Sequence, residues 1–340
     1  MRFGLGPLTI EAAAGKNHVD IYEEALEQAV IAEWWGFDSV WLDERNFTSG
    51  SFNSSSSVLA AAVAQRTSFV RVGMMPILGL VNAMYVAEEA ACVDNIANGR
   101  VIVAGQVPSA EVARGWGGQA SAARMIDDIA VMRKSWGPNP FNHHSEFHTI
   151  PGELEPHTVA AGLHSISVQP NPAQLDVPVW IAGETTAAGV AADLGIPYFG
   201  PANLSVEELR PLYAMSAPRH GEIVPLMREV FIAPTTQEAM DSARPMLDAL
   251  YRSLQDSGEV SGYTSFEEFA KDRFIIGDPD TCIEQLYRCQ NELGVNYVVA
   301  RIAYHGMHAG LTAKAIQLFG QGVVPEFRMF GLPDEIRKVV

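Results

Sequence analysis

A helical pattern and a buried-strand pattern meet within residues 32–47, AEWWGFDSVWLDERNF, and this junction constrains the fold more than any other stretch. Apolar residues recur at helical spacing over residues 20–35, and Gly36 ends that pattern. A short, nearly continuous apolar run follows at residues 37–42 and is typical of a strand in a parallel sheet covered by helices. The junction therefore predicts a β-α-β unit.

The same order of strand and helix recurs along the whole chain. We expect strands at residues 2–5, 39–42, 69–75, 101–104, 177–183, 196–200, 223–232 and 296–302, with a helix after each. Eight such repeats predict an α/β protein with a (β/α)8 barrel, formed as a single domain over residues 1–340. Residues 137–176 lack a sustained period and are expected to cross the barrel top, as an insertion between strands four and five. Residues 235–273 contain one predicted helix and part of another, which is more chain than one barrel crossover requires, so a second insertion is predicted between strands seven and eight.

Charge and composition limit the partners. The formal net charge is −17 at pH 7, so nucleic acid and anionic membranes would be repelled, and neither is expected as a partner. The amino terminus carries no leader pattern, and no apolar run is long enough for a membrane span. Cys92, Cys282 and Cys289 are dispersed, and Cys92 lies in a helical pattern typical of buried thiols. These features predict a soluble cytoplasmic protein with reduced cysteines.

Two groups of polar residues stand where α/β barrels carry their chemistry, directly after predicted strands. The first is the run Asp43, Glu44, Arg45 and Asn46.

The second group, Gly183, Glu184, Thr185 and Thr186, opens a helix. Free backbone N–H groups, the helix dipole and two hydroxyls would there stabilise a bound anion. A threonine-capped helix without a ligand is the alternative interpretation.

Several segments together resemble the bacterial luciferase-like monooxygenases, a family of flavin-dependent barrels. They are residues 32–47, 66–73 (RTSFVRVG), 87–100 (AEEAACVDNIANGR), 177–183 (VPVWIAG), 275–286 (IIGDPDTCIEQL) and 318–328 (LFGQGVVPEFR), in the family's order. The resemblance implies a flavin at the carboxyl ends of the strands, usually reduced FMN. In one branch of the family a deazaflavin coenzyme transfers hydride instead. A homodimer formed mainly through the early helices is also implied.

The resemblance also implies roles for individual residues. It assigns Ala182 and the turn at 183–186 to the FMN phosphate, with Arg124 as a further anion ligand, although a solvated helix arginine is the alternative. It places the flavin ring against Met75 and Pro76 and beside Gln106. Relatives often hold a strained cis bond at this strand end, and proline lowers its cost from about 2.5–4 to roughly 0.5–1 kcal/mol. A cis Met75–Pro76 bond is therefore expected, with a trans proline that ends the strand as the alternative.

The candidate catalytic residues depart from the family pattern. Glu44, Arg45 and Asn46 match a glutamate and two histidines of the luciferases. Arginine stays protonated, so it can orient groups or stabilise an anion but cannot replace histidine as a general base. Gln106 and Val107 likewise replace a cysteine and an arginine. Luciferase-type aldehyde chemistry is therefore not expected.

The preferred hypothesis is a two-component monooxygenase. A separate reductase would supply reduced FMN, and a partly apolar small organic substrate would receive one oxygen atom while the barrel excludes water. A deazaflavin-dependent hydride-transfer oxidoreductase and a catalytically silent flavin-binding barrel are the alternatives, and a metal-dependent sugar-phosphate barrel is a distant one.

Two groups of histidines have weaker functional interpretations. The histidines of the run HHSEFH at 143–148 suggest zinc only weakly, because no partner carboxylates stand at a fixed spacing. Tyr304, His305 and His308 follow the last strand and either contact substrate or cap the last helix.

Overall fold

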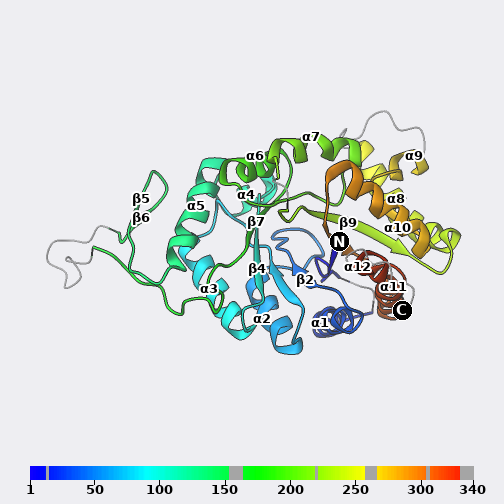
Figure 1. Ribbon diagram of the computed structural model, residues 1–340, viewed down its shortest axis with the longest axis horizontal. Helices are drawn as coiled ribbons and strands as arrows, with labels where there is room; N and C mark the ends of the chain where they lie inside the picture. Colours follow the sequence, from blue (N-terminus) through cyan, green and yellow to red (C-terminus); the bar gives the residue numbers. More distant parts are fainter. Residues whose placement is uncertain (13–14, 153–163, 219–220, 257–265, 304–306, 330–340) are drawn as a thin grey trace.

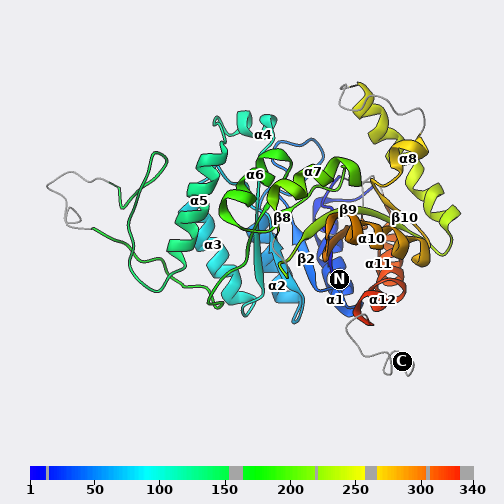
Figure 2. The ribbon, with the colours of Figure 1, turned by 45° about the horizontal axis from the view of Figure 1, so that its top comes forward.

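The computed structural model describes residues 1–12, 15–152, 164–218, 221–256, 266–303 and 307–329. Nine parallel strands form one curled sheet in the order β10-β9-β11-β1-β2-β3-β4-β7-β8, with helices packed around it (Figures 1 and 2). The strands are β1 (Arg2–Leu5), β2 (Ser39–Leu42), β3 (Arg71–Met74), β4 (Val101–Gln106), β7 (Val179–Ala182), β8 (Tyr198–Phe199), β9 (Pro225–Ile232), β10 (Ile275–Gly277) and β11 (Tyr297–Arg301). A parallel bridge joins Gly200, directly after β8, to Leu226 in β9, so the curled sheet returns upon itself there.

The helices follow the strands as the alternating pattern predicts. They are α1 (His18–Trp34), α2 (Ser56–Arg66), α3 (Ala83–Ile96), α4 (Ala110–Gly115), α5 (Ala122–Ser135), α6 (Thr185–Leu194), α7 (Val206–Ser216), α8 (Thr236–Asp256), α9 (Phe266–Ala270), α10 (Pro279–Leu293), α11 (Ala309–Gly322) and α12 (Val324–Met329). Local sequence sets where many of them begin, because the side chains of Asn17, Ser55, Asn82 and Asp278 accept a backbone N–H from the first turn. None of the helices in the described residues is long and apolar enough to cross a membrane.

The core has two layers on opposite faces of the sheet. Alternate strand residues such as Val40 and Leu42 pack under the helices in one large cluster. The other alternate residues fill the inside of the curl with a second cluster: Trp41, Met75, Ile102, Ala104, Trp180, Ala182, Phe199, Tyr297 and Val299. Ser39 anchors this inner cluster, because its hydroxyl lies 2.7 Å from both the Trp41 indole nitrogen and the Tyr297 hydroxyl.

Each of the eight predicted strands overlaps a strand of the sheet, and three expectations need correction. The short strand β10, which pairs with the second half of β9, was not expected. Cys92 is exposed on α3, whereas Cys282 and Cys289 are buried, and all three are free thiols.

The third correction concerns the described part of residues 137–176. It contains the antiparallel pair β5 (His143–His144) and β6 (Thr149–Ile150) and projects beyond α5, away from the sheet (Figure 1), rather than crossing the barrel top. Two histidines hold this segment to α5: His143 Nε2 lies 2.7 Å from Asp127 Oδ1, and His148 Nε2 lies 2.6 Å from Asp128 Oδ1.

Candidate functional site

The carboxyl ends of β3, β4 and β7 form one continuous rim. The backbone N–H of Gln106 donates to the Pro76 carbonyl over 2.8 Å, and that of Val107 donates to the Ala182 carbonyl over 3.1 Å. The Gln106 side chain also donates to the Met75 carbonyl over 2.6 Å. The residues expected to contact a cofactor ring therefore lie beside the turn expected to bind its phosphate.

The Met75–Pro76 peptide bond is trans, so the expectation of a cis bond is wrong. Trans is the ordinary state of an X-Pro bond. Gln106, at the end of β4, donates to the Met75 carbonyl with its side chain and to the Pro76 carbonyl with its backbone, and Ile77 forms a parallel bridge with Gln106. The alternative interpretation, a proline that ends the strand, is the one the structure has.

The amino terminus of α6 has no side-chain cap. Glu184 occupies the capping position without a capping hydrogen bond, and Thr185 and Thr186 are exposed in the first turn. The first intrahelical bond runs from the Ala188 N–H to the Glu184 carbonyl, so the preceding amides of the turn have no helical acceptor. The threonine-capped alternative is therefore not what the structure shows, and the turn presents donors that an anion would satisfy.

Gly183 brings the chain close enough to the neighbouring loop for this turn to form. Its φ of 143° lies in the region that side chains rarely adopt, and a Cβ there would lie 3.2 Å from the side chain of Val107. A larger residue would push the α6 turn away from the end of β4.

Arg124 lies in the first turn of α5, which packs against α6. Ser121 caps this helix by accepting the Arg124 backbone N–H over 3.2 Å. The Arg124 side-chain Nε is buried and has no hydrogen-bond partner in the described residues. A buried guanidinium nitrogen without an acceptor is a donor available to an anion.

Glu44 ties the loops after β2 and β3 together. Its Oε1 accepts the backbone N–H and the hydroxyl of Ser56 over 3.0 and 2.8 Å, and its Oε2 accepts the Ile77 N–H over 3.3 Å. Burial raises the pKa of Glu44, and the hydrogen bonds from Ser56 and Ile77 only partly oppose this. The carboxyl group therefore holds its proton to a higher pH than an ordinary glutamate.

Arg45 belongs to an ion network on the other half of the rim. Its guanidinium binds Asp43 over 2.8 Å and Glu11 over 2.9 Å, and Glu11 also faces Arg301, whose partner is Glu229 over 3.0 Å. Burial lowers the pKa of Arg45, but the nearby carboxylates outweigh it and raise the pKa overall. Arg45 is thus a fixed cation that can orient other groups.

The Asn46 side chain makes fewer polar contacts than those of Glu44 and Arg45. Its amide nitrogen donates to the Ser54 carbonyl over 3.3 Å, while its Oδ1 is buried without a partner among the described residues.

Three members of the ion network, Glu11, Glu229 and Arg301, were missed from the sequence. A signal was present, because Glu229 interrupts an apolar strand and Arg301 ends one. Their pairing depends on the register of β9 with β11, which places Arg301 opposite Glu229. Periodicity alone does not supply that register.

The second-tier histidine candidates lie away from this rim or act as caps. No group of three His, Cys, Asp or Glu residues suited to a metal occurs in the part of the chain that the structure describes. His308 is the amino-terminal cap of α11, since its Nδ1 accepts the Gly310 N–H over 3.1 Å. Tyr304 and His305 lie outside the described residues.

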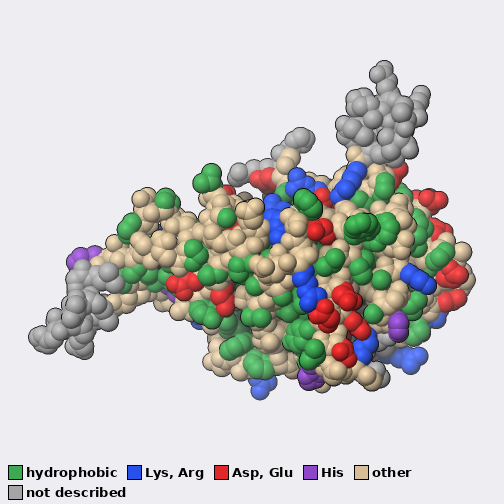
Figure 3. Space-filling model, turned by 90° about the horizontal axis from the view of Figure 1, so that it is seen from below, with side chains coloured by type: hydrophobic (Ala, Val, Ile, Leu, Met, Phe, Trp, Pro, Cys, Tyr) green, Lys and Arg blue, Asp and Glu red, His purple; other side chains and the backbone are tan. Residues whose placement is uncertain are grey.

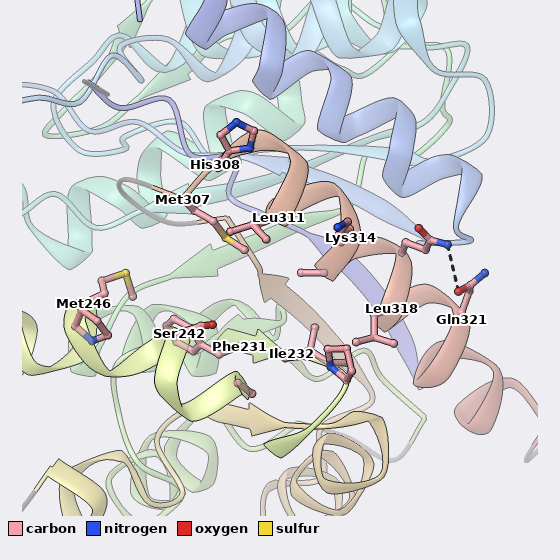
Figure 4. Close-up of a pocket in the computed structure, with 16 residues that line it drawn as sticks. Phe231, Ile232, Ser242, Met246, Met307, His308, Leu311, Lys314, Leu318 and Gln321 are labelled. Carbon is pink, nitrogen blue, oxygen red and sulfur yellow. Dashed lines mark hydrogen bonds between the residues drawn. The ribbon is translucent and has the colours of Figure 1, made fainter. Parts of the chain in front are cut away.

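A cavity of about 910 Å³ lies elsewhere, between α8, α11 and the end of β9 (Figure 4). Of the predicted site residues, only the second-tier candidate His308 is among the described residues that line it. We therefore define the candidate site by the hydrogen-bonded rim at the ends of β3, β4 and β7, and not by this cavity.

Comparison with known proteins identifies the family of this chain. The model of the luciferase-like monooxygenases matches residues 1–297. The chain belongs to this family. Among curated relatives, the uncharacterized protein YvbT of Bacillus subtilis is 25% identical over 201 residues, which cover 56% of this chain and 53% of YvbT. The chain thus matches about half the length of this relative.

Solved structures of similar fold cover nearly the whole chain. The monooxygenase RslO1 from Streptomyces bottropensis has a TM-score of 0.82 at 19% identity, over 96% of this chain and 100% of that one. The oxygenating constituent of 3,6-diketocamphane monooxygenase from Pseudomonas putida, solved with FMN, has a TM-score of 0.76 at 17% identity, over 96% and 98%. An F420-dependent secondary alcohol dehydrogenase reaches 0.71 at 18%, over 95% and 98%. At these identities the likeness shows the shared fold.

Proposed function

We propose that this protein is a two-component flavin-dependent monooxygenase. In this proposal a separate flavin reductase supplies reduced FMN, and O2 then oxygenates a partly apolar small organic substrate. The single observation that carries the proposal is the uncapped start of α6, which lies on the same rim as Pro76 and Gln106. Family membership supports the flavin-type cofactor. We further propose a single (β/α)8 domain over residues 1–340 that works as a cytoplasmic homodimer.

The residues present fit a phosphorylated flavin. The free amides and hydroxyls of Thr185 and Thr186 would hold the phosphate, with the unpartnered Arg124 Nε as a further donor. Ala182, Gly183 and Glu184 shape this turn, and Met75, Pro76 and Gln106, which are joined by hydrogen bonds, would lie against the flavin ring. The cofactor supplies the redox chemistry, and the chain binds, orients and excludes water.

Glu44, Arg45 and Asn46 are the proposed catalytic residues. Glu44 is the group suited to moving a proton, because its raised pKa brings the carboxyl closer to neutral pH. Arg45 keeps its charge, and its ion pairs with Asp43 and Glu11 fix the loop after β2 at the rim. Asn46 contributes a buried amide oxygen that a substrate donor could satisfy.

The first test compares FMN with riboflavin, which lacks the phosphate, by calorimetric titration of the purified protein. We expect FMN to bind more tightly and Arg124→Gln to weaken FMN about tenfold without changing riboflavin, since a hydrogen bond to a charged group contributes about 1.5–3 kcal/mol. Arg133→Gln, an exposed arginine on the same helix, is the control and should change neither. Equal affinity for the two flavins would refute the phosphate site.

The second test separates the reaction classes. Oxygen uptake coupled to product formation, with reduced FMN and a candidate organic substrate, is the expected result. Tight binding of the deazaflavin coenzyme with oxygen-independent hydride transfer would instead establish the alternative that F420-dependent proteins of the same fold favour. Flavin binding without turnover of any substrate would identify a silent binding barrel.

A further inference from the structure

The cavity between α8 and α11 is a groove lined mainly by apolar side chains. Sixteen residues line it, among them Phe231 at the end of β9, Met246 on α8, and Leu311 and Leu318 on α11 (Figure 4). The α11 positions 311, 314, 315, 318 and 321 recur at three- and four-residue intervals, so one helix face forms a wall about 15 Å long at 1.5 Å per residue. Leu311 on this wall is 56% exposed although its side chain is apolar.

The charge of the groove differs from that of the whole chain. The chain has 40 acidic and 23 basic residues, yet none of the sixteen lining residues is acidic. Lys314 and His308 are the titratable members, and the His308 ring is engaged as the cap of α11. The Lys314 ammonium forms no ion pair among the described residues and is the cation of a groove whose lining is mainly apolar, with Ser242, Gln317 and Gln321 as further polar members.

The size of the groove suits a small molecule. Ligand pockets typically enclose about 300–1,000 Å³, and this volume of about 910 Å³ falls within that range. A stable protein partner would require about 800 Å² from each side, far more than a groove between two helices offers. A mainly apolar wall that carries one ammonium between Leu311 and Leu318 is complementary to an apolar chain with an anionic head.

We infer that this groove is a binding site for an apolar organic anion, such as an alkyl carboxylate, separate from the rim at β3, β4 and β7. The apolar chain lies along α11 against Phe231 and Met246, and the head group pairs with Lys314. Binding there requires no flavin, so the inference stands apart from the proposed monooxygenase activity.

The test is calorimetric titration of the full chain with decanoate, with decyltrimethylammonium as the matched cation, below their micelle concentrations. We expect decanoate to bind with one site per chain and the cation to bind at least tenfold more weakly. Lys314→Gln should weaken decanoate about three- to fivefold, as the loss of one exposed ion pair does. Leu311→Glu, at an exposed position that tolerates substitution, should weaken it further by placing a negative charge on the wall.

Lys271→Gln removes an exposed lysine outside the groove and should leave decanoate binding unchanged. The inference is overturned if decanoate does not bind, if the cation binds equally well, or if Lys314→Gln and Leu311→Glu both leave the affinity unchanged while circular dichroism shows them folded.

Discussion

Trp41 occupies the centre of the inner cluster, with ring centroids 4.9 Å from Trp180 and 5.0 Å from Phe199. Its indole fits because the neighbouring strands carry Gly4 and Gly73, where any Cβ would overlap the ring or its Ser39 partner. The glycines are thus required by close packing inside the curl. The requirement is local and can be tested one residue at a time.

At Gly73 we expect Gly73→Ala to lower the free energy of unfolding by about 1–3 kcal/mol, because the added methyl overpacks against Trp41. Urea-induced unfolding measures the change. Gly189→Ala is the matched control, since Gly189 lies within α6 with nothing near its Cβ position, and alanine there should stabilise by about 0.5–1 kcal/mol. A Gly73→Ala protein as stable as the wild type would contradict this account of the core.

Single residues also mark the limit of what sequence could predict about the site. Met75, Gln106 and Gly183 could be placed on one rim because each follows a strand of a parallel sheet. The state of the Met75–Pro76 bond was predicted wrongly, because the family resemblance favoured cis over trans, the ordinary state of an X-Pro bond and the one that the structure has. The pairing of Arg301 with Glu229 depends in the same way on strand register.

At the scale of elements, α1 helps to shape the start of β3. Glu33, near the end of α1, accepts the backbone N–H groups of Ser68, Phe69 and Val70 through its carboxylate over 2.6–3.0 Å. Burial raises the pKa of Glu33, but the three backbone donors together outweigh it and hold the pKa below its usual value. The Glu33 side chain therefore links α1 to the turn that precedes β3.

Glu33→Gln should destabilise the protein by about 1 kcal/mol at pH 7, less than a fully buried charged hydrogen bond contributes, because water still reaches the carboxylate. A lowered native pKa means that the stabilisation is complete above the unfolded pKa near 4.3 and is lost as pH falls through the native pKa. The gap in urea midpoint between wild type and variant should therefore shrink below about pH 4. Glu27→Gln, an exposed glutamate on α1, should show no gap at either pH. A gap in urea midpoint that does not change with pH would refute the lowered pKa of Glu33 as the source of this stabilisation.

Periodicity predicted most of the elements, because each strand and helix carries its own apolar spacing over enough residues. Strand β10 was missed because it is too short to show an apolar spacing of its own. It has only three residues directly before the cap of α10, and it exists because Ile275 and Ile276 pair with the distant β9. Short strands of this kind depend on their partners.

At the scale of the whole molecule, the face that Figure 3 shows carries hydrophobic side chains interspersed with acidic and basic ones. Val58 on α2 and Tyr85 on α3 are 67% and 62% exposed, and the two helices pack together. They belong to the early helices through which the family resemblance implies dimer formation. Exposed apolar residues on adjacent helices are consistent with such an interface.

We expect a mass of about twice 36.9 kDa by size-exclusion chromatography with light scattering. The double variant Val58→Glu/Tyr85→Glu should run as a monomer, because charges placed in an apolar interface cannot be desolvated cheaply. Met215→Glu, at an exposed apolar residue of α7, should keep the wild-type mass. A double variant that remains dimeric would place the interface elsewhere.

The rings of Trp41, Trp180, Phe199 and Tyr297 pack together and fill the middle of the curled sheet. Any cofactor, substrate or product of the proposed reaction would consequently have to enter and leave on the carboxyl-terminal side of the strands. Oxidised flavin and product would then leave on the same side from which the next reduced flavin and substrate approach.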